Sequence, residues 1–569
     1  MKLLTLPLCL ILLCFAAFSA DEEFSEFTKK IESFVLPNGL TIILYPRGDA
    51  PVISCVTYVK AGSTDEHVGI TGIAHQLEHL AFKGTPYVGT KDYEAEKAAL
   101  SEIDKLYGTI QELEQKVPAD MRDGFLTLLA QVTSTGSARG KDVQHAQQIM
   151  IKQAKDLMDS WKKAGVTLSE ADQKKLTDLV VTYAAKVQDA EKYVEQNQYS
   201  NLIDRAGGTG LNAFTSDDRT VFHVSLPANR LELWASLESD RFMNTVPRQL
   251  EKEKQVVLEE RRMRTDSSPF GKLYESFLGV AFQAHPYGTA VIGNRSDILE
   301  YSRPKIGEFY RTHYVPGETI VAVVGDIDVP AAKKLLTDYF GRIPAAPNPG
   351  PLVTVEPAQE GERRLEVEFP ANPLLLLGYH VPERNHPDTP ALVMLSEIAT
   401  SGRTSRLETD LVKTKKANSV GSWLGPGERY PRLIFFDAEV AAQQNPNADP
   451  QEVYTQQLKA LNDLEANLFV EIEKLKTETP TPEEMKRVIT RYRSAVLREM
   501  KSNLSLAQEL ADYQAIAGDW HALFREIQQI SAVTPEQVTA MAKKYLTKEN
   551  RTVGRVVPVP VTEGKHAGL

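Results

Sequence analysis

The most restrictive feature of this sequence is an order of elements that occurs twice. In the first copy, Pro304 begins a helical pattern that runs to Tyr314, and the strand-like apolar run 320–324 follows. The second copy consists of Pro535, Tyr545 and the apolar run 553–557, and the proline and tyrosine are ten residues apart in both copies. A repeated helix–turn–strand unit predicts an α+β fold that arose by duplication, with two homologous domains.

A proline-rich stretch provides the boundary between the two halves. Residues 344–351 read Pro-Ala-Ala-Pro-Asn-Pro-Gly-Pro, a composition typical of a linker. We therefore predict an N-terminal domain over residues 28–344, a linker over 345–352 and a homologous C-terminal domain over 353–560. A chain of 569 residues is long enough for at least two hydrophobic cores.

A long helical pattern interrupts the first half. Leu100, Ile103, Leu106 and Ile110 recur at spacings of three and four residues, which predicts an amphipathic helix that stops at Pro118. Similar apolar stripes follow among charged residues, over 149–161 and 176–194. We interpret residues 94–197, approximately, as a helical insertion whose stripes pack against one another. The alternative, that the insertion docks another protein, stays open.

Two histidines and a glutamate form the motif with the clearest chemistry. If His75, Glu78 and His79 lie on one helix, the histidines are about 40° apart around its axis and the glutamate is on the same flank. Two imidazoles on one face can bind zinc, in the inverted His-x-x-Glu-His order. A catalytic zinc normally has three protein ligands and a water, so a third ligand must come from elsewhere.

The best source of a third ligand is the segment 253–260, Glu-Lys-Gln-Val-Val-Leu-Glu-Glu. On a helix, Glu253 and Glu260 share a face, whereas Glu259 points roughly 100° away. Glu260 is thus the candidate ligand and Glu253 its neighbour. Taken alone, these acids could be a solvated helix face, and the histidine pentapeptide could be a chance surface motif.

Together, the two segments resemble the paired signature of the pitrilysin and insulysin (insulinase-like) zinc peptidases. The resemblance implies that His75, His79 and Glu260 bind Zn²⁺, that Glu78 acts as the general base on the metal-bound water, and that Glu253 supports catalysis. It also implies two domains, each a mostly antiparallel sheet with helices packed on it, which face each other as a clamshell. The chain is similar to the half-length, exported bacterial members.

Further segments fit the same family in the same order. They are Leu36-Pro-Asn-Gly-Leu40, Phe82-Lys-Gly-Thr85, His285-Pro-Tyr287 and Val324-Gly-Asp-Ile327. Residues 208–216 resemble the family's substrate-binding edge strand, which implies that Asn212, Ala213 and Phe214 bind substrate. An exposed sheet edge can pair with an extended peptide, although the simpler interpretation is an ordinary sheet edge.

The second half departs from the family in one respect. Relatives with complete sites use an arginine and a tyrosine from this half, seven residues apart, to hold the substrate and stabilise the oxyanion. Here the matching region, residues 411–420, reads Leu-Val-Lys-Thr-Lys-Lys-Ala-Asn-Ser-Val and has neither at the expected places. Because half-length relatives often divide these roles between subunits, we expect a homologous partner that bears the arginine and tyrosine, or a homodimer.

The function implied is that of a zinc-dependent endopeptidase subunit that hydrolyses short or unfolded peptides. A protein of another class, a catalytically weak peptide-binding or processing-complex scaffold, is the alternative. The complete set of His75, Glu78, His79 and Glu260 favours the enzyme, whereas the missing arginine and tyrosine favour the scaffold. A net charge of -11 and a pI near 5.6 argue against nucleic acid as a partner.

The N-terminal residues predict export. An apolar run over 3–18 is followed by Ser19-Ala20 and an acidic segment, which is typical of a signal peptide over residues 1–20. The expected destination is the periplasm or the exterior. After its removal only Cys55 remains, so no internal disulfide is expected. No other run is apolar and long enough to predict a transmembrane segment.

Overall fold

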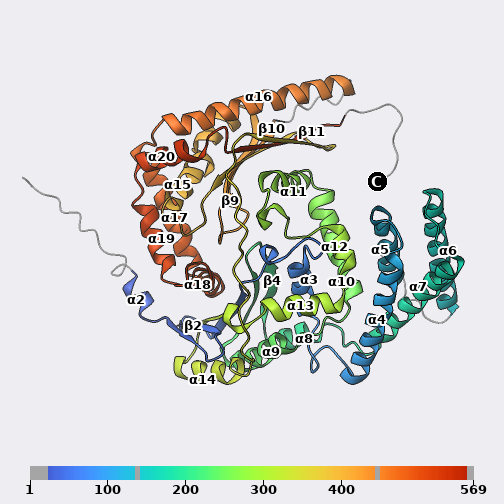
Figure 1. Ribbon diagram of the computed structural model, residues 1–569. Helices are drawn as coiled ribbons and strands as arrows, with labels where there is room; N and C mark the ends of the chain where they lie inside the picture. Colours follow the sequence, from blue (N-terminus) through green and yellow to red (C-terminus); the bar gives the residue numbers. More distant parts are fainter. Residues whose placement is uncertain (1–23, 135–140, 442–448, 560–569) are drawn as a thin grey trace, which may run out of the picture.

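The computed structural model describes residues 24–134, 141–441 and 449–559, and these ranges contain two β-sheets (Figure 1). The first sheet has six strands in the order β1-β2-β6-β3-β5-β4 and the second has five in the order β7-β11-β8-β10-β9. The first-sheet strands are β1 (Glu32–Val35), β2 (Thr41–Pro46), β3 (Val52–Val59), β4 (Thr209–Thr215), β5 (Thr220–Pro227) and β6 (Thr319–Gly325). The second-sheet strands are β7 (Arg363–Glu368), β8 (Leu374–Val381), β9 (Ala417–Gly425), β10 (Arg432–Val440) and β11 (Arg551–Val557).

The two sheets share one topology, which confirms the predicted duplication. Strand β6 pairs parallel to β2 and antiparallel to β3, and β11 pairs in the same way with β7 and β8. The remaining pairs are antiparallel in both sheets. The helix before β6 is α13 (Arg303–His313) and the helix before β11 is α20 (Pro535–Tyr545), so both copies of the repeated unit form as the sequence predicts.

Helices cover the sheets. The first half contributes several of them besides α13 and the insertion. They are α2 (Ser25–Thr28), η1 (Ser63–Asp65), α3 (Ile73–Ala81), α8 (Gln198–Arg205), η3 (Ala228–Arg230), α9 (Leu231–Asn244), α10 (Leu250–Arg261), the π-helix η4 (Arg262–Asp266), α11 (Pro269–Ala281), η5 (Pro286–Gly288), α12 (Arg295–Glu300), η6 (Pro316–Glu318) and α14 (Val329–Phe340). The second half adds α15 (Thr389–Thr400), the π-helix η7 (Glu408–Val412), α16 (Pro450–Thr477), α17 (Pro482–Glu499), α18 (Asn503–Ala517) and α19 (Ala522–Ser531).

Each half supplies a helix that covers the other half's sheet. Helix α18 packs on β3 and β6, where Leu506 and Leu510 share a core with Tyr58. Helix α11 packs on the second sheet, where Phe277 lies against Phe435. Alternate residues of β6 belong to two different hydrophobic cores, one on each face of the sheet, so every residue of this strand is buried. The two halves are therefore interlocked.

The proline-rich stretch lies between these halves. Residues 344–362 contain no helix or strand. Their anchor is Glu356, whose carboxylate accepts hydrogen bonds from the backbone N–H groups of Gln283, Ala284 and His285 at 2.8–3.0 Å. Hydrogen bonds to a charged acceptor are stronger than those between neutral groups. These three bonds therefore fix the connection to the first half.

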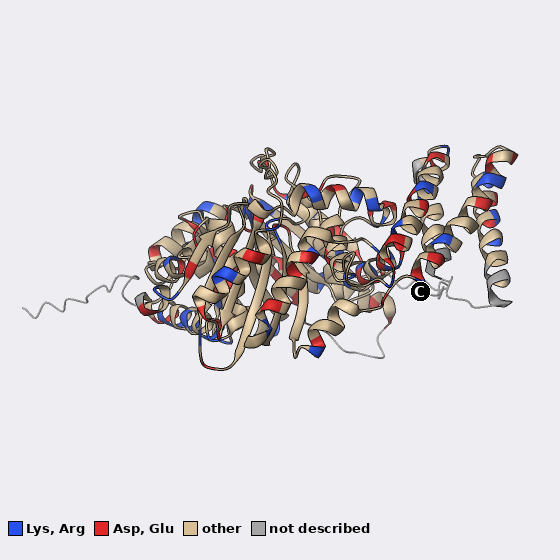
Figure 2. Cartoon of the chain, turned by 90° about the horizontal axis from the view of Figure 1, so that it is seen from below, with Lys and Arg blue, Asp and Glu red and all other residues tan. Residues whose placement is uncertain are grey.

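The insertion is a group of four helices that projects from the rest of the chain (Figure 1). They are α4 (Tyr93–Glu114), α5 (Ala119–Ser134), α6 (Lys141–Lys163) and α7 (Glu170–Glu191). Their apolar stripes form a separate core, as predicted, with Ile110, Phe125 and Val180 among the buried side chains. Figure 2 shows basic and acidic residues interspersed along these helices. In the part of the chain that the structure describes, no helix has the length and apolarity that crossing a membrane requires.

Helix α5 lies within the predicted helical insertion, but no apolar stripe in the sequence singled it out. Its apolar residues point in two directions, because Phe125 and Leu128 face the insertion core whereas Leu126 and Ala130 pack with Leu299 of the main body. A helix buried on two sides has no single apolar stripe, so the pattern used to find helices is weak there. This helix joins the insertion to α10 and α12.

Glu114, at the end of α4, provides a test of the insertion's contribution to stability. Burial raises the pKa of Glu114 to about 7, and the Glu300 carboxylate adds to the effect. One of its oxygens is buried without a hydrogen-bond partner among the described residues. A carboxyl with a raised pKa in the folded state binds its proton more tightly than the unfolded chain does. The free energy of unfolding should therefore fall as the pH rises from about 4.5 to about 7.

Glu114→Gln removes this ionisation. The variant should be more stable than the parent at pH 8 by up to about 3 kcal/mol and similar to it near pH 4.5. Denaturant unfolding at both pH values would measure the difference. An equal difference at the two pH values would mean that ionisation of Glu114 is not its cause.

Candidate metal centre

Helix α3 carries His75, Glu78 and His79, and its first turn is held by a carboxylate that lies shortly before it in the sequence. Gly72 precedes the helix with φ 86°, a left-handed conformation that favours glycine. The Glu66 carboxylate accepts hydrogen bonds from the N–H groups of Gly72 at 2.6 Å and Ala74 at 2.8 Å. A carboxylate at a helix N-terminus satisfies free N–H groups and interacts favourably with the helix dipole.

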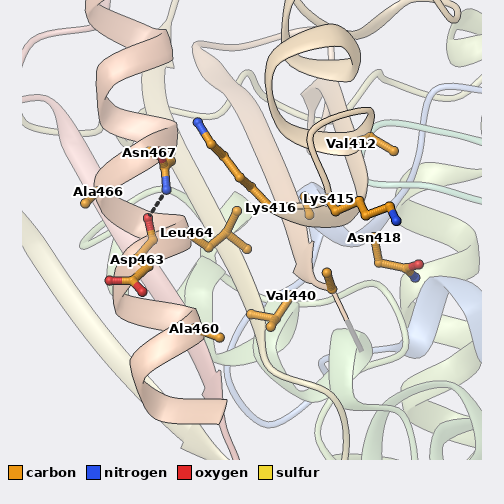
Figure 3. Close-up of a pocket in the computed structure, with 12 residues that line it drawn as sticks. Val412, Lys415, Lys416, Asn418, Val440, Ala460, Asp463, Leu464, Ala466 and Asn467 are labelled. Atoms are coloured by element: carbon orange, nitrogen blue, oxygen red, sulfur yellow. Dashed lines mark hydrogen bonds between the residues drawn. The ribbon is translucent and has the colours of Figure 1, made fainter. Parts of the chain in front are cut away.

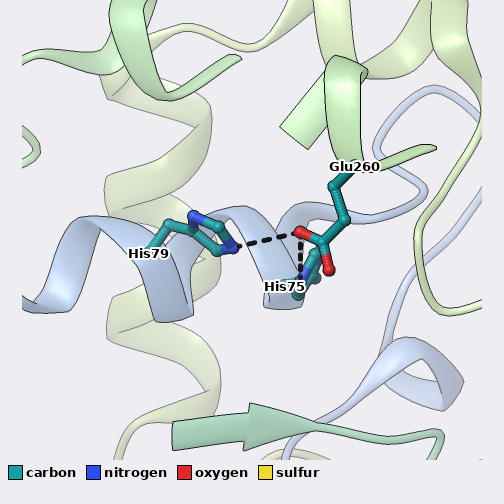
Figure 4. Close-up of side chains that lie close together, drawn as sticks. All are labelled: His75, His79 and Glu260. Atoms are coloured by element: carbon teal, nitrogen blue, oxygen red, sulfur yellow. Dashed lines mark ion pairs between the residues drawn. The ribbon is translucent and has the colours of Figure 1, made fainter. Parts of the chain in front are cut away.

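Helix α10 brings Glu260 to both histidines (Figure 4). Oε2 of Glu260 lies 3.6 Å from Nε2 of His75 and 3.5 Å from Nε2 of His79. One ligand atom from each of the three residues lies within 4.8 Å of the others. The structure thus unites the three predicted ligands, although more than 170 residues separate the histidines from the glutamate.

These distances fit a zinc ion. Bonds of about 2.1 Å at tetrahedral angles place neighbouring ligand atoms about 3.4 Å apart. Both nitrogen-to-oxygen distances are within a few tenths of an ångström of that value. Two imidazoles and one carboxylate are also a ligand set that catalytic zinc sites use, with one position left for water.

A second carboxylate, Glu253, orients His79. Oε2 of Glu253 lies 3.5 Å from Nδ1 of His79, and Nζ of Lys83 lies 2.6 Å from the other oxygen of Glu253. A partner on Nδ1 directs Nε2 towards the site and fixes the orientation of the ring. Glu253 is therefore next to a predicted ligand, on the same face of α10 as Glu260. Glu259 instead pairs with Arg262 on the exposed side.

Glu78 occupies a different position from the ligands. Its carboxylate is largely buried, and Oε2 accepts a hydrogen bond of 2.7 Å from the hydroxyl of Thr215. Burial raises the pKa of Glu78, while the Thr215 hydrogen bond opposes the rise. A raised pKa makes a carboxylate a stronger proton acceptor.

The charges of the two histidines differ in the metal-free protein. Burial and the charge of His79 lower the pKa of His75 to about 4, so its imidazole is neutral at physiological pH. Burial also acts to lower the pKa of His79, but the hydrogen bonds with Glu253 and Glu260 outweigh it and raise the pKa to about 9. A hydrogen bond from His79 lowers the pKa of Glu260, which keeps this carboxylate anionic.

The predicted substrate-binding residues lie on β4 at the edge of the first sheet. Strand β4 pairs with β5 alone among the described strands, and it reaches the site because Thr215 is its last residue. Asn212 is exposed, Ala213 is buried, and the side chain of Phe214 is 37% exposed. The free edge of β4 therefore runs towards the general-base candidate.

Sequence reasoning did not single out Thr215, Lys83 or Arg264. Lys83 follows His79 by four residues and Arg264 follows Glu260 by four, a spacing at which helical side chains meet. That spacing could have indicated Arg264, which does pair with Glu260. Nothing comparable indicated Lys83 or Thr215, because each contacts a residue of a distant segment, Glu253 and Glu78 respectively.

A cavity of the second half lies away from these residues (Figure 3). Its volume is about 830 Å³, and its lining includes Lys416, Asn418, Asp463 and Asn467. The lining has a single carboxylate and neither histidine nor cysteine, so it offers no set of metal ligands. The side chains able to bind a metal therefore lie on α3 and α10, and this cavity does not provide them.

A His-His-Glu site inside a duplicated α+β fold is the arrangement of a metallopeptidase. Two family patterns match the sequence: "Insulinase (Peptidase family M16)" over residues 43–164 and "Peptidase M16 inactive domain" over residues 301–492. The chain belongs to peptidase family M16, the insulinase-like family.

Individual relatives agree with this assignment. The zinc protease PqqE of Helicobacter pylori is 28% identical over 378 residues, which cover 63% of this chain and 79% of the relative. The crystal structure of a protease from Helicobacter pylori has a TM-score of 0.67 at 23% identity, covering 93% of this chain and 99% of that one. The periplasmic protease PqqL of Escherichia coli has a TM-score of 0.58 at 17% identity, and the match covers 93% of this chain but 48% of PqqL. At these identities the structures show a shared fold.

Proposed function

We propose that this protein is a zinc-dependent endopeptidase subunit that hydrolyses short or unfolded peptides. The observation that carries the proposal is the convergence of His75, His79 and Glu260, with both nitrogen-to-oxygen distances close to tetrahedral spacing. Two of its relatives are named zinc proteases, which supports the choice of metal. His75, His79 and Glu260 would hold the ion, which when bound polarises the peptide carbonyl and lowers the pKa of a coordinated water.

The proposed role of Glu78 is to accept the proton of the attacking water. The Thr215 hydroxyl fixes one carboxylate oxygen, Oε2, so that the other remains available as the proton acceptor. Glu253 keeps the His79 ring in the orientation that ligation requires, since it contacts the nitrogen that would not bind the metal.

The proposed substrate is an extended peptide that pairs with the free edge of β4. Backbone hydrogen bonds along an edge strand recognise main chain more than side chains, which suits unfolded segments of varied sequence. Asn212 and Phe214 would contact the peptide from the exposed face, and Ala213 would help to fix the strand.

The second half supports the proposal of a partner subunit. Helix α15 follows β8 as α3 follows β3, yet its sequence, Thr-Pro-Ala-Leu-Val-Met-Leu-Ser-Glu-Ile-Ala-Thr, has no histidine. The matching family pattern is itself described as an inactive domain. A homologous subunit would supply the missing arginine and tyrosine, and export to the periplasm or beyond is part of the same proposal.

Peptide hydrolysis by the purified mature chain tests the proposal. With zinc and a quenched, unstructured peptide, we expect turnover that a chelator abolishes and added zinc restores. Addition of a homologous subunit co-purified from the native source should increase the rate. If the peptide binds but is cleaved neither with nor without that subunit, the protein is a peptide-binding scaffold instead.

A further inference from the structure

Arg264 contacts the candidate metal ligand Glu260 from the side opposite the histidines. Nη1 of Arg264 lies 2.6 Å from Oε1 of Glu260, while Oε2 of the same carboxylate faces the two imidazoles. One carboxylate oxygen of Glu260 thus contacts Arg264, and the other faces the candidate metal position. Glu260 precedes Arg264 by four residues, which is the favourable order for a helical ion pair.

We infer that Arg264 is a positioning residue that fixes Glu260 as a ligand through a single oxygen. The terminal torsion of a glutamate has broad, nearly two-fold preferences, so a carboxylate with one free oxygen can rotate between binding modes. A charge-assisted hydrogen bond to Oε1 restrains that rotation and leaves Oε2 for the ion. This inference rests on the proposed zinc site and adds a residue that contacts one of its ligands.

The backbone of Arg264 is well placed for this role. It lies in the π-helix η4, which continues α10 and closes with a hydrogen bond of 2.8 Å from the N–H of Ser267 to the carbonyl of Arg262. Helix α11 then packs directly on the same segment, since a Cβ atom on Gly271 would lie 2.0 Å from the carbonyl oxygen of Arg264. The main chain is therefore fixed by packing, although the Arg264 side chain is 73% exposed.

Two arginines of the second half have acidic partners of their own. Arg384 is engaged by Glu428 and Asp512, and Arg429 lies 3.9 Å from Asp65. The positive charge beside Glu260 thus comes from the first half, on the same helical segment as the ligand.

The exposure of the Arg264 side chain determines which measurement can test its role. Ion pairs with an exposed member contribute little to folding stability, so replacing Arg264 should leave the melting temperature of the metal-free protein unchanged. Outer partners of metal ligands affect metal affinity, typically by about 10–100-fold. Zinc affinity is therefore the appropriate measurement, independent of peptide turnover.

The experiment compares three variants by competition for zinc with a chromogenic chelator. Arg264→Gln should weaken zinc binding by about 10–100-fold, and Arg264→Lys, which keeps a cationic donor, should recover part of the loss. Arg262→Gln is the matched control, because Arg262 lies in the same π-helix but pairs with Glu259, which is not a candidate ligand. It should bind zinc as the parent does.

His79→Ala in the same assay separates two kinds of failure. If His79→Ala loses zinc but Arg264→Gln binds it within twofold of the parent, the positioning role of Arg264 is wrong and the zinc site stands. If both bind zinc like the parent, the zinc site itself is wrong. Parent-like zinc affinity with a raised KM in Arg264→Gln would also overturn the inference, because Arg264 would then contact the peptide.

Discussion

Replacing Glu78 with glutamine is expected to lower kcat by about 10²–10⁴-fold while zinc remains bound. The amide has nearly the same size and can still accept the hydrogen bond from Thr215, but it cannot accept a proton. Glu78 is not one of the three residues whose donor atoms converge, so metal binding should survive. Steady-state kinetics on a quenched peptide, with zinc content measured by mass spectrometry, would check both parts.

Glu259→Gln is the control for that experiment. Glu259 neighbours the candidate ligand in sequence, yet it pairs with Arg262 on the exposed side of α10. Its substitution removes the same charge and should leave turnover unchanged. Unaltered turnover in Glu78→Gln, in an active preparation, would remove Glu78 from the role of general base.

Replacing His79 with alanine is expected to remove both zinc and activity. Apparent binding free energies of about 10–16 kcal/mol for four-ligand structural zinc sites imply roughly 3 kcal/mol per ligand, or more than a hundredfold in affinity. Chelator competition would give the affinity, and peptide assays at rising zinc concentration would show whether any activity returns.

His521→Ala provides the matching histidine control. His521 is exposed, lies in the second half and pairs with Asp519. Its removal should alter neither zinc affinity nor turnover. Stoichiometric, tight zinc binding by His79→Ala would contradict the proposed ligand set and require a metal site elsewhere.

Helical spacing made the candidate site partly predictable. Residues four apart on one helix must share a flank, so the spacing alone pairs His75 with His79. The same geometry separated Glu253 and Glu260 from Glu259, and the structure confirms that separation. The roles assigned to Glu78, Glu253 and β4 stay predictions until the variants are measured.

The fold was predictable for a similar reason. The repeated Pro304-to-Tyr314 and Pro535-to-Tyr545 units each become a helix followed by a central strand. Local pattern does not reveal which helix covers which sheet, however. Helix α18 packs on the first sheet and α11 on the second through their apolar faces. The sequence pattern of an apolar face does not indicate which sheet it covers.

The ligand types, the face that each occupies on its own helix, and the duplication were all predictable from the amino-acid sequence alone. Those properties follow from residue chemistry and from fixed helical and strand periods. Three contacts became visible only in the folded chain: Glu260 meets both histidines, Thr215 donates a hydrogen bond to Glu78, and Arg264 contacts the second oxygen of Glu260. Contacts between distant segments depend on how whole helices and strands pack. This packing is determined by many residues of both cores together, and no single motif specifies it.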